Sequence, residues 1–252
     1  MSASAPQYSF GSGVLFGRRT GVTNPTPVRF GALQDVSIDI SFTTKELYGQ
    51  YQFPLAIGRG TAKITGKAKF AQFNAQAFND LFFGEASAPA TGETITAVQE
   101  AANVSANTVT VSHNSTFAQD LGVLVAATGQ VLQRVASAPS GTGNYSCNET
   151  TGVYTFNSAM NNTAVQVSYN YTDAANGATI TIANQLLGTS PQFLIVLAET
   201  FNSNKLNLQL NACMANKLTL ATKLEDFTIP EFDFQAFADA SNNVGTLSLE
   251  AL

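Results

Sequence analysis

The side chains that most often carry out chemistry in proteins are scarce in this sequence. Its 252 residues include one histidine, His113, and two cysteines, Cys147 and Cys213. This supply is too small for a zinc site of histidine and cysteine and excludes most acid–base catalysis by histidine. His113 lies beside serines in an ordinary loop-like segment, Cys147 is expected in a loop and Cys213 in a core. We therefore expect no catalytic site and no enzyme.

Acidic residues near the C-terminus provide the next candidate site. Glu225, Asp226, Glu231 and Asp233 could bind a divalent cation or act as a carboxylate pair. However, Pro230 interrupts this segment, and alternation places Asp233 on the solvent side of a strand. We favour the structural interpretation and expect no metal and no cofactor.

Three lysines share one face of an alternating segment over residues 61–70. Lys63, Lys67 and Lys69 could contact phosphate on that face. We favour ion pairs with neighbouring carboxylates such as Asp39, because exposed opposite charges on adjacent strands commonly pair.

The composition favours a folded chain that leans towards β structure. Apolar residues make up 44% of the chain, charged residues 12%, and the formal net charge is −5. Disorder needs the opposite balance, and a dedicated nucleic-acid binder needs a basic surplus. The apolar runs fall short of the roughly 20 residues that cross a bilayer, and no signal peptide is visible. We therefore expect no membrane insertion and synthesis in a cytoplasm.

The elements that must position any site are mostly strands. Val36, Ile38, Ile40 and Phe42 alternate with polar residues, which predicts a strand with one wet face. A connection over 43–60 separates this strand from the next and is longer than a hairpin turn needs.

The connection over 43–60 is unusually apolar for a loop. Its large apolar and aromatic residues are Leu47, Tyr48, Tyr51, Phe53, Leu55 and Ile57. So much apolar area must be buried, and we expect it to pack against another subunit.

One segment has helical spacing. Phe73, Ala77, Phe78, Leu81 and Phe82 predict an amphipathic helix of about three turns that ends at Gly84. A linker of small residues follows over 85–92.

The middle of the chain differs from its flanks. Residues 92–177 are rich in Asn, Thr, Ser and Gly. Six short β runs predict a sandwich-like insertion, with an immunoglobulin-like sandwich as the candidate fold. They are 95–98, 104–111, 122–126, 130–135, 153–157 and 164–171. Apolar strands then return, and residues 193–198 look buried on both faces. The predicted organisation is a discontinuous β core, 1–91 and 178–252, around the insertion 92–177.

Several stretches resemble the tail tube (major tail) proteins of tailed bacteriophages. The stretches in the first hundred residues are 30–39, 45–49, 64–69 and the helix ending at Gly84. Segments 152–156, 167–171 and 226–240 are similar to other parts of phage tail proteins. The order strand, long loop, strand, helix is that of the family, whereas the large middle section departs from a minimal tube protein.

This resemblance implies a mainly β fold of the tail-tube type. That fold is a β-sandwich or barrel with one flanking α-helix and, here, a β-rich inserted section. It implies hexameric rings whose strands line a channel and which stack into a tube that delivers phage DNA to the host. The long loop makes ring-to-ring contacts in the family, so the ring-stacking candidates are Lys45, Leu47, Tyr48, Tyr51 and Phe53. Asp39 is the candidate for a side chain that faces the lumen.

The implied partners are further copies of the chain and the other tail proteins. The latter are the tape measure, the tail terminator, the baseplate or tip and, in a contractile tail, the sheath. DNA would pass through the lumen without specific binding, for which the net negative charge is suited. The implied location is the virion tail, assembled in the cytoplasm of the bacterial host.

A second interpretation is a β-sandwich binding module for a host surface or glycan. The binding unit would be residues 92–177, and the features favouring it are Tyr145, Tyr154, Tyr169 and Tyr171. Tyrosine is enriched at interfaces but is also an ordinary strand residue. The tyrosines are therefore compatible with both interpretations.

Overall fold

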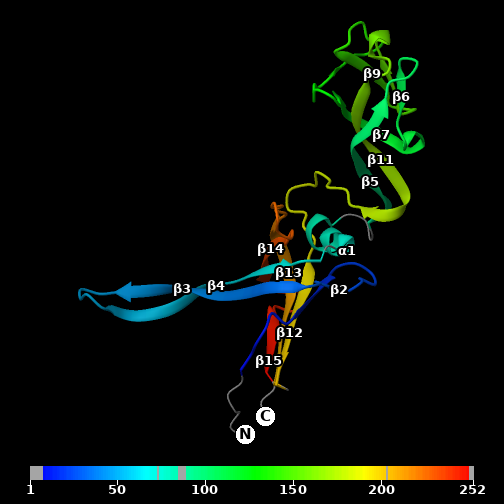
Figure 1. Cartoon of the computed structure of the whole chain (residues 1–252). Coiled ribbons are helices and arrows are strands. Elements are labelled where there is room, and N and C mark those ends of the chain that lie inside the picture. Colours follow the sequence, from blue (N-terminus) through cyan, green and yellow to red (C-terminus); the bar gives the residue numbers. More distant parts are fainter. Residues whose placement is uncertain (1–7, 73, 85–88, 203, 250–252) are drawn as a thin grey trace. The chain divides into compact units, whose positions relative to one another are not determined.

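The computed structural model describes residues 8–72, 74–84, 89–202 and 204–249. The chain divides into two compact units, the first made of residues 1–89 and 180–252 and the second of residues 90–179. The bounds of 92 and 177 expected for the insertion lie just inside the second unit. Both units consist mostly of antiparallel strands, which confirms the mainly β fold class (Figure 1).

An eight-stranded sheet forms the first unit. Its order is β2-β1-β12-β13-β14-β4-β3, and β15 pairs with β13 beside β14. The bounds are β1 Val14–Arg19, β2 Val28–Arg29, β3 Leu33–Tyr48, β4 Pro54–Phe70, β12 Phe193–Phe201, β13 Asn204–Thr219, β14 Glu231–Phe237 and β15 Gly245–Leu249. The alternating segments that predicted strands around 36–42 and 61–70 lie in β3 and β4.

The segment 43–60 is a hairpin, so its prediction as a long loop is wrong. β3 and β4 stay paired as far as Tyr48 and Pro54. A β-bulge interrupts the ladder just after Phe42, and the hydroxyl groups of Thr43 and Thr61 lie 3.1 Å apart across it. A bulge bends and twists a ribbon without ending it, which is why the pairing continues to the turn.

The end of this hairpin leaves the sheet. β14 accompanies β4 only between Ile64 and Lys69. Beyond Ile64 the hairpin continues as a two-stranded ribbon, which Figure 1 shows extending away from β12 and β13. Residues 40–63 are termed the arm below.

The expected helix is present after β4. α1 (Ala75–Phe78) runs directly into a π-helical turn, η1 (Asn79–Phe83). The side chain of Asn74 caps its start by accepting a hydrogen bond from the Ala77 N–H at 3.1 Å. Gly84 ends it with a left-handed φ of 63°. Phe73, the first apolar residue of the prediction, lies outside the described residues.

The helix packs on one face of the sheet and completes the core there. Leu81 is buried, and Phe78 and Phe82 pack against the same cluster. The ring centroid of Phe232 in β14 lies 5.6 Å from that of Phe82 and 5.0 Å from that of Phe30. Aromatic contacts of this kind add to the free energy of apolar burial.

β12 alternates between this core and the opposite face. Phe193 and Ile195 are fully buried in the core. Leu194, Val196 and Ala198 are only half-buried. The expectation that residues 193–198 are buried on both faces is therefore wrong for the single chain.

The second unit contains two sheets around its own core. A three-stranded sheet has the order β5-β11-β7, and a four-stranded sheet has the order β6-β10-β9-β8. The bounds are β5 Ala90–Asn103, β6 Thr108–Thr110, β7 Phe117–Val125, β8 Gln133–Arg134, β9 Asn144–Asn148, β10 Val153–Phe156 and β11 Ala164–Thr179; short 3-10 turns, η2 Asn114–Thr116 and η3 Ser158–Met160, connect some of them.

The sequence pattern missed or misplaced parts of this unit. β9 was not predicted, because its polar composition hides a single large core side chain, Tyr145. The strand expected over 130–135 is reduced to β8 and one bridge from Val131 to Leu124. Within the linker expected over 85–92, residues 85–88 lie outside the described residues and 90–92 belong to β5.

A buried carboxylate joins the two sheets of the second unit. Asp120 of β7 accepts hydrogen bonds from the hydroxyl groups of Tyr145 (2.7 Å) and Tyr154 (3.0 Å), on β9 and β10. The Nε atom of Arg134 lies 3.6 Å from the same carboxylate, which is 3% exposed. Burial and these hydrogen bonds raise the pKa of both tyrosines.

Gly66 provides a test of the packing between β4 and β14. A Cβ atom added there would lie 2.1 Å from Cζ of Phe234. We expect Gly66→Ala to lower the free energy of unfolding by about 1–3 kcal/mol, because the core must shift to admit the methyl group. Thermal unfolding followed by circular dichroism measures this change.

Gly58→Ala is the matched control for this prediction. The nearest atom to a Cβ at Gly58 is 4.0 Å away, so we expect little change in Tm. Equal losses of Tm in the two variants would contradict the packing described for Gly66.

Candidate self-association surface

The arm has two chemically different faces. Ile40 and Phe42 follow Val36 and Ile38 at every second position, and the latter two pack against the core of the first unit. Past the bulge, the guanidinium of Arg59 lies 4.0 Å from the centre of the Phe42 ring, which places Arg59 on the same face. One face of the arm therefore continues the core face of the sheet beyond the core.

This face is uncovered in the single chain. The large apolar side chains of the arm on this face and around its turn are exposed by 45% (Phe42) to 81% (Phe53). They are Ile40, Phe42, Tyr48, Tyr51, Phe53, Leu55 and Ile57. Contiguous exposed apolar area of this kind marks an interaction site.

The structure divides the five predicted ring-stacking residues between the faces. Tyr48 lies on the apolar face, and Tyr51 lies in the turn. Phe53 directly precedes β4 and is exposed. Alternation places Lys45 and Leu47 on the opposite face, although Leu47 is 62% exposed.

The prediction omitted Ile40 and Phe42 from the site. It assigned them to a strand with a covered face, whereas no described residue of the first unit covers them. Polar Thr44 and Glu46 interrupt the apolar positions between Phe42 and Tyr48, so the sequence pattern carries no clear signal for this face.

The opposite face is charged and balanced where β3, β4, β13 and β14 lie side by side. Cross-strand register places equal numbers of basic and acidic residues there. They are Lys63, Lys67, Lys69, Lys217, Asp35, Asp39, Glu231 and Asp233.

Two of the three predicted lysines, Lys67 and Lys69, pair with neighbouring carboxylates, but not with Asp39. Lys67 Nζ lies 2.6 Å from Glu231, and Lys69 Nζ lies 3.8 Å from Glu231 and 4.0 Å from Asp35. The hydrogen bond with Lys67 lowers the pKa of Glu231. Asp39 is exposed and lies opposite Thr65, so the expected pairing with Asp39 is wrong.

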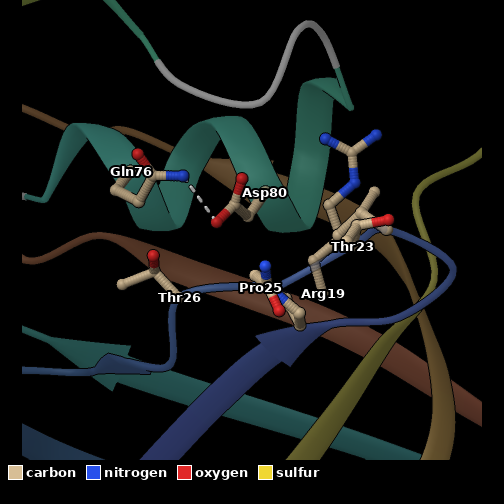
Figure 2. A pocket seen from close by; sticks show the side chains of 8 residues that line it. Arg19, Thr23, Pro25, Thr26, Gln76 and Asp80 are labelled. Carbon is tan, nitrogen blue, oxygen red and sulfur yellow. Dashed lines mark hydrogen bonds between the residues drawn. The ribbon is translucent and has the colours of Figure 1, made fainter.

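A small cavity beside the helix is not a substrate site. It is lined by the loop after β1 and by the helix, and Figure 2 shows Gln76 and Asp80 bonded at its wall. Asp80 is 4% exposed and accepts a hydrogen bond from Gln76 Nε2 at 2.7 Å. The volume of the cavity, about 50 Å³, fits a few water molecules, whereas ligand sites are several times larger.

The residues considered for chemistry have structural contacts. The His113 ring stacks on Tyr171 with centroids 3.8 Å apart, and the His113 backbone N–H donates to the Tyr169 hydroxyl. Cys147 lies in β9 and not in a loop, whereas Cys213 is in the core as expected. Burial raises the pKa of these thiols to about 11 and about 12, so both are protonated at neutral pH.

The acidic residues near the C-terminus do not converge. Asp226 lies 3.5 Å from Lys223, and Glu231 pairs with Lys67. Within the described ranges, no group of three or more His, Cys, Asp or Glu side chains is placed to hold a metal ion.

The tyrosines that favoured a binding module lie mostly in the core of the second unit. Tyr145, Tyr154 and Tyr169 are 3%, 0% and 0% exposed. Tyr171 is half-buried under His113. Rings that fill a core cannot be presented to a glycan, so this feature no longer favours the binding-module interpretation.

Comparisons with known proteins do not identify a family for this chain. No protein-family model matches the sequence, and no curated protein matches it. Of the helices in the described part of the chain, none is both long and apolar enough to span a membrane.

A carboxylate in the second unit provides a test by pH. Glu100 accepts hydrogen bonds from the Tyr169 hydroxyl (2.6 Å) and from the N–H and hydroxyl of Ser112 (2.8 and 2.9 Å). Burial opposes ionisation, but these hydrogen bonds outweigh it and lower the pKa of Glu100. A carboxyl with a lowered pKa stabilises the fold above its unfolded pKa and loses that effect as the pH falls through the folded value.

We therefore expect the Tm to fall on acidification below about pH 4.3. In Glu100→Gln this decrease should be shallower, because the titrating group is gone. Near-UV circular dichroism between about pH 3 and pH 7 measures it. The exposed Glu93→Gln serves as control and should keep the original pH dependence. A Glu100→Gln curve parallel to the original would contradict the assigned role.

Proposed function

We propose that this protein is a structural subunit that assembles with copies of itself into stacked rings, forming the tail tube of a tailed bacteriophage. The observation that carries the proposal is the apolar face of the arm, which a single chain leaves in water. The phage assignment adds the resemblance of segments 30–39, 45–49 and 64–69 to tail tube proteins.

Burial of the arm provides the driving force for assembly. Full burial of one large apolar side chain is worth about 1.5–3 kcal/mol. A two-stranded ribbon is marginally stable in water by itself. Contact with another subunit would therefore both cover the arm and hold it in shape.

Open sheet edges support assembly into rings. The sheet of the first unit ends at β3, whose outer edge is unpaired within the described chain. Among the described strands, β15 pairs with β13 alone. Unpaired edges of this kind favour pairing with another chain, and joining them around a symmetry axis removes them.

The charge distribution supports a passage that does not hold DNA. The second unit has five acidic residues and one arginine, so it accounts for most of the net charge of −5. The net negative charge that the sequence suggested for the lumen therefore lies mostly outside the sheet. A lumen lined by the balanced face, with Asp39 on it, would attract phosphate weakly, because its basic and acidic residues are equal in number and Lys67 and Lys69 are paired.

Assembly of the purified protein tests the proposal. We expect rings or tubes by electron microscopy and a mass that rises with concentration by light scattering. Replacing two residues of the apolar face, Phe42→Ser and Ile57→Ser, should leave a folded monomer, because the apolar contact is lost. Val98→Ser makes the same kind of change at a residue 72% exposed on the second unit and should assemble normally. An unmodified protein that stays monomeric at high concentration would overturn the proposal.

A further inference from the structure

A second uncovered apolar surface lies on the first unit, towards the other end of the sheet from β3. Phe16 of β1 lies opposite Val196 of β12, and Arg18 lies opposite Leu194. Two adjoining hollows of about 450 and 400 Å³ share Phe16 as a common wall. The apolar residues that line them, termed the groove here, are Phe10, Val14, Phe16, Pro27, Leu194, Val196 and Ala198.

The groove lacks the layer that its sequence pattern predicts. Residues 193–198 are apolar at odd and even positions alike, which is typical of a strand covered on both faces. The helix and the core cover one face. Phe16 is 38% exposed on the other, where the described residues of the first unit provide no second layer.

Charge at the groove indicates the kind of occupant. The exposed side chains of Arg18 and Arg29 border the two hollows. Neither guanidinium has an ion pair with any residue in the described part of the chain. Glu199 lines the larger hollow beside Arg29. The groove therefore fits an apolar surface that carries both a carboxylate and a cationic group.

We propose that the groove receives the arm of a second copy of this chain. The apolar face of the arm presents Phe42 and Ile57. It also carries one charge of each sign, Glu46 and Arg59, which can face the arginines and Glu199 of the groove. Glu46 is exposed and bonded to the Tyr48 hydroxyl, so its carboxylate is available near Arg18 or Arg29. The arm of the same copy extends away from β12 (Figure 1). This inference rests on the proposed self-assembly and names its receiving surface.

The pairing of arm with groove determines how the assembly grows. The two surfaces differ, and each copy carries one of each, so the contact is heterologous. Such contacts continue from copy to copy until a ring closes or a fibre forms. An arm-to-arm contact would instead stop at a dimer.

Mixing two defective copies tests this pairing. Phe42→Asp places a charge in the contact surface of the arm, and Phe16→Asp does the same in the groove. Both side chains are exposed enough for each monomer to fold. Each variant alone should stay monomeric, with self-affinity reduced by about thirtyfold or more. An equimolar mixture should form dimers with one copy of each variant and grow no further, because each dimer retains only broken surfaces. Native mass spectrometry measures the composition.

Leu121→Asp, at an exposed position of the second unit, is the matched control and should assemble like the unmodified protein. A mixture that stays monomeric while the unmodified protein assembles would overturn the groove as receiver and leave the proposed function standing. Dimers of Phe16→Asp alone would also overturn it, since they require contact between arms. An unmodified protein that does not assemble would overturn both proposals.

Discussion

A two-stranded ribbon with one apolar face cannot bury that face by itself, and this constraint shapes the first unit. β14 leaves β4 beyond Ile64, and β15 occupies the following stretch of β13. The sheet therefore forks, and the arm loses both its neighbouring strand and the cover of the helix. Ile40, Phe42 and Ile57 nevertheless lie on the continuation of the core face, so apolar side chains of that face extend into water.

The face of the sheet away from the helix is divided in its chemistry. Near β1 and β12 it is apolar, with Phe16 and Val196 at its centre. Near β4 and β14 it carries paired charges, such as Lys67 with Glu231. Paired charges are typical of a sheet face that lies in water, whereas a contiguous apolar area is not. We propose that a further layer covers the apolar part, and the arm of a second copy has the apolar character that such a layer needs.

The second unit buries its large aromatic side chains within itself, whereas the arm leaves its own exposed. Its tyrosines fill a core between two sheets. Asp120 accepts hydrogen bonds from the hydroxyl groups of two of them across that core. A buried carboxylate with satisfied hydrogen bonds fixes the relative position of the strands that surround it. The unit therefore needs no partner to cover its aromatic residues, and its contribution to the proposed assembly is most of the negative charge.

Elements with local signals could be predicted from the order of residues. Alternation identified β3 and β4 around Val36 and Lys67, and helical spacing with Gly84 identified the helix. The hairpin over 43–60 escaped detection because the bulge after Phe42 breaks the alternation of β4 against β3. The ion pair of Lys67 with Glu231, and the exposure of the arm and the groove, follow from the packing of the first unit. Periodicity is a property of neighbouring residues, whereas ion pairing and exposure depend on which distant strand, if any, lies alongside.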